Sequence, residues 1–213
     1  MRTTALLGMS LALLSVAGCA GTERSRNLYD PSVPAKVTAQ QVCSNCHGID
    51  GNSTSPNFPN LAAQQEAYFI AQLKSFKSHG RFDPEGFEYM WGISRSLSDE
   101  QIKDLAAYFA KQTPKANPPG DTKLLSAGKE IFEIGVPAQN IPACMVCHGP
   151  QGQGNATFPR IANQHADYII KQLHVFQRTD ERPEGAVMKP IAHSLTAENV
   201  AAVAAYLESM PLQ

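Results

Sequence analysis

The chain has 213 residues, enough for one large domain or for two domains of about 100 residues each. Hydrophobic residues make up 43% of the chain and charged residues 17%, so the chain can bury a core and is not expected to be disordered. Its 18 Lys and Arg against 19 Asp and Glu give a formal net charge of -1, which argues against nucleic acid as a partner, because a nucleic-acid-binding surface neutralises many phosphates.

The N-terminal segment has the layout of a secretory signal. Arg2 supplies the basic start, Ala5 to Val16 the apolar centre, and Ala17 and Gly18 the small residues of a cleavage site. The apolar run is shorter than the roughly 20 residues of a membrane-spanning helix. A buried N-terminal helix is the alternative, but the run has no polar face and breaks at Gly18. We therefore predict a signal peptide over residues 1–18.

The residues at the predicted cleavage point resemble a bacterial lipoprotein signal. In Val16-Ala17-Gly18-Cys19 a cysteine follows two small residues, although Val16 stands where Leu is commoner. In such signals the cysteine is acylated and becomes the new N-terminus. The resemblance implies a lipid on Cys19, with residues 19–35 as lipid anchor and tether. Ordinary cleavage, which would discard Cys19, is the alternative.

The remaining four cysteines form two motifs, Cys43-Ser44-Asn45-Cys46-His47 and Cys144-Met145-Val146-Cys147-His148. The probability of two such motifs by chance is on the order of 10⁻⁵ for this composition. The two thiols of a C-x-x-C turn can add to the two vinyl groups on one edge of a haem, and the following His then lies under the iron. We predict two covalently bound haem c groups.

The C-x-x-C part of these motifs also occurs in two other kinds of site. A disulfide or thioredoxin-like redox pair needs only C-x-x-C, and it leaves both following histidines unexplained. A tetrahedral zinc site usually joins two C-x-x-C pairs over a short loop, whereas Cys43 and Cys144 are 101 residues apart. Neither alternative accounts for the whole motif.

The two halves of the chain repeat. Phe58-Pro59-Asn60-Leu61-Ala62-Ala63-Gln64 matches Phe158-Pro159-Arg160-Ile161-Ala162-Asn163-Gln164 at an offset of 100 residues. Between the halves, the proline-rich segment from Thr113 to Gly120 is typical of a stiff linker. We predict one domain over residues 36–117 and a second over residues 118–213.

The periodicity within each half is helical. Apolar residues follow helical spacing from Ile102 to Phe109 and from Val200 to Leu207, and Ser98 with Gln101 predicts a capping box. Middle helices are predicted from Gln64 to Ser78 and from Gln164 to Gln177. No alternating strand pattern is evident, which predicts an all-α fold.

Symmetry also indicates a sixth iron ligand. Met90 precedes Leu97 by seven residues, and Met188 precedes Leu195 by the same distance. A thioether is a soft ligand that favours Fe(II) and leaves no vacant position for a substrate. The other histidines do not recur at aligned positions, and we expect them on the surface or in loops: His79, His165, His174 and His193.

These features together resemble the two-haem class I cytochromes c of the cytochrome c4 family. The resemblance covers about residues 36 to 213, through C-S-N-C-H-G, F-P-N-L-A-A-Q and Met90 and their second-half copies C-M-V-C-H-G, F-P-R-I-A-N-Q and Met188. It implies two tandem class I cytochrome c domains of short helices around a covalent haem c. It also implies that the carbonyls of Pro59 and Pro159 accept the second ring N–H of the haem histidines.

One departure concerns helix packing. The second half has Gly128 and Phe132, suited to packing against Tyr206, but no such pair precedes Cys43. We therefore expect the first domain to be less tightly closed.

The resemblance implies a periplasmic electron carrier with no catalytic residue. Its donor would be a quinol-cytochrome c reductase or a dehydrogenase, and its acceptor a terminal oxidase or reductase. Two alternatives stay open: a cytochrome subunit of a dehydrogenase complex, and a haem enzyme or sensor with one open iron site.

Overall fold

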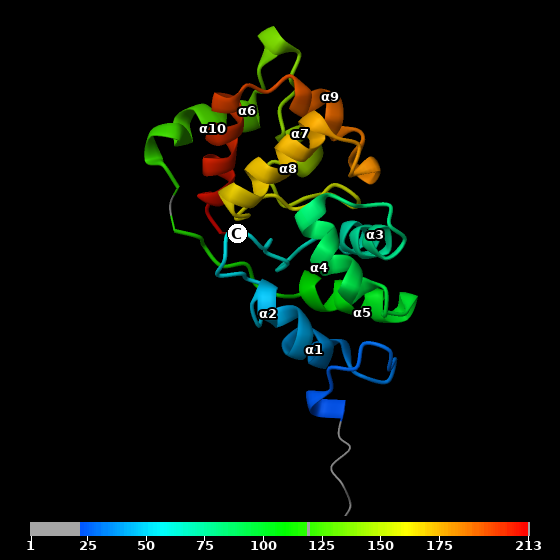
Figure 1. Cartoon of the computed structure of the whole chain (residues 1–213). Helices are drawn as coiled ribbons and strands as arrows, with labels where there is room; N and C mark the ends of the chain where they lie inside the picture. Colours follow the sequence, from blue (N-terminus) through cyan, green and yellow to red (C-terminus); the bar gives the residue numbers. More distant parts are fainter. Residues whose placement is uncertain (1–21, 119, 213) are drawn as a thin grey trace, which may run out of the picture.

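The computed structural model describes residues 22–118 and 120–212, and its regular structure is helical (Figure 1). Within this part of the chain, the β pairing consists of two isolated bridges, Val136 with Ile141 and Asn155 with Phe158. The predicted all-α class is confirmed. Short 3-10 turns at Thr22–Arg24, Thr122–Leu124, Pro137–Gln139 and Pro183–Gly185 supplement the helices.

The helices fall into two sets of similar order. The first domain contains α1 (Ala35–Thr38), a π turn (Ala39–Cys43), α2 (Ser44–His47), α3 (Glu66–Lys77), α4 (Pro84–Ser94) and α5 (Asp99–Ala110). The second contains α6 (Leu125–Glu133), α7 (Met145–His148), α8 (Ala166–Arg178), α9 (Met188–His193) and α10 (Ala197–Glu208). The segment between Ala110 and Thr122 joins them, and its described residues, 111–118 and 120–121, are not helical; it includes the predicted boundary at residue 117.

Each domain has its own core around its last helix. In the first, α3 packs on α5, and the rings of Phe69 and Phe109 stack at 5.5 Å between centroids. In the second, α8 and α6 pack on α10 around Phe132 and Val203. The predicted capping box is present, because Ser98 Oγ accepts from the Gln101 amide at 3.1 Å and Gln101 Oε1 accepts from the Ser98 amide at 2.9 Å.

The middle helices begin two residues later than predicted. Gln65 and His165 precede them with ψ angles of 126° and 132°, which are not helical. The side chains just before these starts, Gln64 and Gln164, are turned toward the other domain and hydrogen-bond to its backbone. Sequence periodicity alone cannot distinguish a residue that contacts the other domain from a residue in the first turn of a helix.

The two domains close differently at their first helix. Gly128 lets α6 approach α10 so closely that a Cβ there would lie 2.1 Å from the Ala202 carbonyl oxygen. The Phe132 and Tyr206 rings contact each other at 5.7 Å between centroids, as their positions in the sequence predicted. In the first domain the first helix runs without a break from α1 through the π turn into α2, and α1 packs against α5.

Part of the predicted tether packs on the first domain. Val33 is buried and Leu28 packs against the core, while Gln101 Nε2 donates to the Asp30 carbonyl at 3.1 Å. Residues 28–33 of the predicted tether therefore belong to the first domain, because Leu28 and Val33 add apolar contacts to it. The predicted signal peptide and the predicted lipid site at Cys19 lie outside the described residues. In the described part, the helices are too short or too polar to cross a membrane.

The close contact at Gly128 gives a prediction for stability. Gly128→Ala should lower the denaturant midpoint of the holoprotein, by a destabilisation of about 1–3 kcal/mol, because the methyl group collides with backbone that cannot rotate away. Gly92→Ala in α4 is the control, since a Cβ there meets nothing within 4 Å and helix propensity favours Ala. An unchanged midpoint for Gly128→Ala would contradict this packing.

Candidate haem-binding sites

Each C-x-x-C-H motif forms a single helical turn at the surface of its domain. Cys43 ends the π turn and His47 ends α2, while Cys144 precedes α7 and His148 ends it. Gly48 and Gly149 follow with φ angles of 75° and 83°, a left-handed conformation that terminates the turn at low steric strain for glycine. The two thiols of a motif thus lie one turn apart on the same side.

The four cysteines of the motifs form no disulfide with one another. Burial raises the pKa of Cys43 to about 12 and that of Cys144 to about 11. A redox-active C-x-x-C pair depends on a lowered thiol pKa, and zinc binding requires thiolates. In addition, the described residues contain no cluster of three or more His, Cys, Asp or Glu side chains that could hold a metal ion. These environments favour neither alternative interpretation.

The two motif histidines have the same hydrogen bond. His47 Nδ1 lies 2.8 Å from the Pro59 carbonyl oxygen, and His148 Nδ1 lies 2.9 Å from that of Pro159. Because a carbonyl oxygen only accepts, Nδ1 carries the proton in both rings. The contact expected from the sequence is therefore present in each half.

This hydrogen bond leaves the other ring nitrogen free to bind a metal. Both imidazoles are buried, and burial lowers the pKa of His47 and His148 although the proline carbonyl opposes the shift. A neutral ring protonated on Nδ1 has its lone pair on Nε2. Among the described residues, Nε2 of neither ring has a hydrogen-bond partner. The donor set of two free thiols and a neutral imidazole fits a covalently attached haem.

Met90 and Met188 lie in corresponding parts of the two domains. Met90 is in the middle of α4 and Met188 is the first residue of α9, and each is partly buried against its own core. The Phe58 ring links α4 to the histidine side of the first domain, since it contacts both His47 and Tyr89 at 6.2 Å between centroids. The role of Met90 and Met188 as the sixth iron ligands stays a prediction.

The expectation for the other histidines was wrong for His165. It lies at the start of α8 with 6% of its surface exposed, and its Nε2 is 3.0 Å from the Ser53 carbonyl oxygen of the first domain. The ring is buried because it fills the contact between the domains. His79 and His193 are exposed, whereas His174 is partly buried on α8 rather than in a loop.

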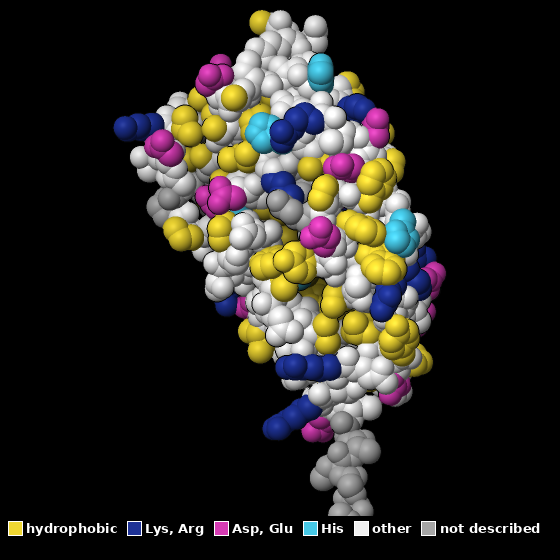
Figure 2. Space-filling model, in the orientation of Figure 1, with side chains coloured by type: hydrophobic (Ala, Val, Ile, Leu, Met, Phe, Trp, Pro, Cys, Tyr) yellow, Lys and Arg dark blue, Asp and Glu magenta, His cyan; other side chains and the backbone are white. Residues whose placement is uncertain are grey.

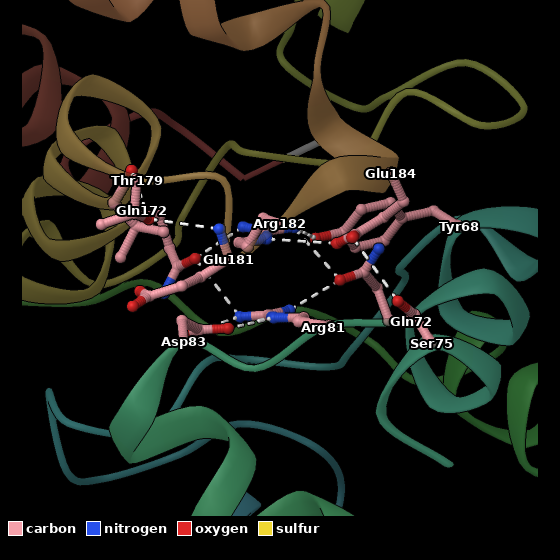
Figure 3. Close-up of polar contacts among 11 residues, drawn as sticks. Tyr68, Gln72, Ser75, Arg81, Asp83, Gln172, Thr179, Glu181, Arg182 and Glu184 are labelled. Carbon is pink, nitrogen blue, oxygen red and sulfur yellow. Dashed lines mark hydrogen bonds and ion pairs between the residues drawn. The ribbon is translucent and has the colours of Figure 1, made fainter. Parts of the chain in front are cut away.

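Sequence reasoning missed a pair of buried arginines between the domains (Figure 3). Arg81 Nη1 donates to Gln72 Oε1 at 2.6 Å and Arg81 Nη2 to Gln172 Oε1 at 3.2 Å. Arg182 makes the mirrored contacts, to Gln172 at 2.6 Å and to Gln72 at 3.1 Å. The signal that could have found this pair is the spacing of Arg81 and Arg182, which equals that of the cysteine motifs.

The arginine pair has carboxylate partners. Arg81 Nε donates to Asp83 at 2.6 Å, and Arg182 Nε to Glu184 at 3.3 Å. Burial alone would raise the pKa of Asp83, but the hydrogen bond and charge of Arg81 hold it below its usual range. The Arg81–Asp83 pair is therefore charged, and both carboxylate oxygens of Asp83 accept hydrogen bonds from Arg81. A buried ion pair is tolerated under this condition.

Two tandem helical domains, each with a C-x-x-C-H turn and a proline-held histidine, define a dihaem c-type cytochrome. The cytochrome c family model matches the chain twice, over residues 33–113 and 125–211. The chain is similar to cytochrome c-552 of Acidithiobacillus ferridurans, 40% identical over 93% of this chain and 85% of that protein. It is also similar to cytochrome c4 of Azotobacter vinelandii, 39% identical over 79% of this chain and 84% of that protein.

The solved structures agree. Reduced recombinant cytochrome c4 from Pseudomonas stutzeri matches with a TM-score of 0.75 and 35% identity, over 83% of this chain and 97% of that one. The chain therefore belongs to the cytochrome c family and, within it, to the cytochromes c4. It is an electron-transfer protein with two covalently bound haem c groups.

The chain is less similar to a second group of proteins, the electron acceptors of thiosulfate dehydrogenases. The thiosulfate dehydrogenase electron acceptor of Stutzerimonas stutzeri is 31% identical over 96% of this chain and 94% of that protein.

Covalent attachment can be tested one motif at a time. A Cys43→Ser, Cys46→Ser protein should carry one covalent haem per chain instead of two, because serine cannot form the thioether bonds. Intact-mass spectrometry and the pyridine haemochrome assay measure this directly. Cys144→Ser, Cys147→Ser is the matched variant for the other domain, and two covalent haems in either variant would contradict the assignment.

Proposed function

We propose that this dihaem cytochrome relays single electrons in the periplasm. The donor is a quinol-oxidising complex such as quinol-cytochrome c reductase, or a dehydrogenase, and the acceptor is a terminal oxidase or reductase. The observation that carries the proposal is the duplicated site, in which two buried imidazoles are oriented alike by the Pro59 and Pro159 carbonyls. Each haem, when bound, supplies a one-electron Fe(II)/Fe(III) couple.

The side chains of this protein tune that chemistry rather than take part in bond making. His47 and His148 would hold the haem irons through Nε2, and the hydrogen bond from Nδ1 to the proline carbonyl fixes the orientation of each ring. Met90 and Met188 would supply thioether ligands, which would favour reduced iron, raise its potential and leave no open site for a substrate. No acid or base is needed, and no catalytic residue is assigned.

The surface supports brief encounters with partners. On the face shown in Figure 2, side chains of opposite charge are interspersed and apolar side chains lie between them. Large apolar side chains on this protein's surface include Phe82, Tyr89 and Val187, which are 47%, 61% and 57% exposed. With a net charge of -1, long-range electrostatic steering is weak, and short-range contacts select the partner.

The sixth ligands can be tested by redox titration. The protein should give two one-electron waves, and Met90→Ala and Met188→Ala should each lower a different wave by more than the 59 mV of a tenfold change, because each removes a soft ligand. Met210→Leu is the control, since Met210 has no counterpart in the first half and is buried in the second core. Unchanged waves in both alanine variants, or immediate cyanide binding by the unmutated protein, would contradict a carrier with closed iron sites.

We propose further that Cys19 carries a lipid that holds the protein at a membrane. The support is the lipoprotein-like segment Val16-Ala17-Gly18-Cys19. Cys19→Ser should move the cytochrome from the membrane pellet to the soluble periplasmic fraction without loss of either haem, because no acyl chain can be added. Equal membrane association of the two proteins in fractionated cells would contradict the anchor.

The cytochrome subunit of a dehydrogenase is the second candidate. It is favoured by the similarity over nearly the whole chain to a thiosulfate dehydrogenase electron acceptor. Purification from the native membrane distinguishes the two, since a subunit elutes with a catalytic chain in fixed ratio and a free carrier elutes alone.

A further inference from the structure

The peptide group that holds each haem histidine also contacts the other domain. The Pro59 carbonyl accepts from His47 Nδ1, and the amide N–H of the same peptide group, that of Asn60, donates to Gln164 Oε1 at 2.8 Å. One peptide plane thus joins the histidine of the first domain to a glutamine of the second.

The second domain repeats this arrangement with the roles exchanged. The Pro159 carbonyl accepts from His148 Nδ1, and the Arg160 amide N–H donates to Gln64 Oε1 at 2.7 Å. Each glutamine also donates to the residue from which it accepts: Gln64 Nε2 donates to the Arg160 carbonyl at 3.1 Å, and Gln164 Nε2 donates to the Asn60 carbonyl at 3.0 Å. Each histidine is therefore connected to the glutamine of the opposite domain.

The backbone presents the two glutamines in a specific conformation. Ala63 and Asn163, the residues just before them, have φ angles of 53° and 58°, in the left-handed region that is uncommon for residues with a side chain. Their amides donate to the Phe109 carbonyl at 2.9 Å and the Leu207 carbonyl at 2.8 Å, near the ends of α5 and α10. The terminal helix of each domain thus holds Ala63 or Asn163 in a strained conformation. This conformation directs the next residue, Gln64 or Gln164, across the interface.

Hydrogen bonds in series strengthen one another. When the N–H of a peptide group donates, its carbonyl oxygen becomes more negative and accepts more strongly. A stronger acceptor at Nδ1 makes the imidazole more basic at Nε2, and a more basic ligand stabilises ferric over ferrous iron. Loss of the glutamine acceptor should therefore raise the potential of the haem whose histidine lies in the opposite domain.

We propose that Gln64 and Gln164 are positioning residues that set the haem potentials crosswise between the domains. Gln64 of the first domain acts on the site of His148, and Gln164 of the second acts on the site of His47. Domain contact and the two potentials are then linked, so that each domain senses whether the other is in place. This inference rests on the proposed ligation by His47 and His148.

The test is spectroelectrochemistry of the holoproteins Gln64→Met and Gln164→Met, in which the side-chain volume is kept and the acceptor is lost. Gln64→Met should raise only the wave that Met188→Ala lowers, and Gln164→Met only the wave that Met90→Ala lowers. The expected size is at least about a twofold increase in the Fe(II)/Fe(III) ratio at a fixed ambient potential. In reduced, ¹⁵N-labelled protein, the Nδ1–H resonance of the opposite domain's histidine should shift upfield while the other stays in place.

The control is Gln65→Met. Gln65 Nε2 donates across the same interface at 2.8 Å, but to the Gln153 carbonyl rather than to a proline peptide group, so both waves should stay unchanged. Shifts of both waves together in Gln64→Met, or an equal shift in Gln65→Met, would overturn the inference in favour of a loosened interface. Two haems with unshifted waves in both methionine variants would also overturn it and leave the carrier function intact, whereas a protein without haem would overturn the proposed function itself.

Discussion

The hydrogen bond from a buried imidazole to a proline carbonyl is the interaction on which the rest of this structure depends. It decides which ring nitrogen carries the proton, and thereby which one can bind iron. It also joins the C-x-x-C-H turn to the loop before the middle helix, two segments that share no helix. Because the same peptide group donates to the opposite domain, the ligand geometry of one site and the placement of the other domain depend on one set of backbone atoms.

The contact between the domains is specified by buried polar groups rather than by apolar area alone. Arg81 and Arg182 would repel each other in a buried site, but both share the side-chain oxygens of Gln72 and Gln172 and each has a carboxylate partner. An interface of this kind tolerates little sliding, since any displacement leaves a buried guanidinium unsatisfied. The two domains are therefore held in one pseudo-symmetric orientation relative to each other, and they are not merely joined by a flexible linker.

The two domains reach closure by different means. In the second, Gly128 permits the backbones of α6 and α10 to touch and Phe132 fills the remaining space against Tyr206. In the first, the helix that begins with α1 continues through the π turn into α2, and Leu28 and Val33 of the preceding chain pack against the domain. The segment that leads to the proposed membrane anchor is thus part of the first domain's core.

The sequence alone determined the fold class, the duplication and the haem motifs, because these follow from local spacing and from repetition at a nearly constant offset, and the resemblance to the cytochromes c4 implied the proline contacts. Helix boundaries at Gln64 and Gln164, the burial of His165 and the Arg81–Arg182 pair were decided only by the tertiary structure. Polar side chains such as these look solvated in a sequence, and only the approach of a second domain turns them into buried hydrogen-bond partners. Within a half, neighbours along the chain fix the geometry, whereas between the halves only the assembled backbone can show which atoms meet.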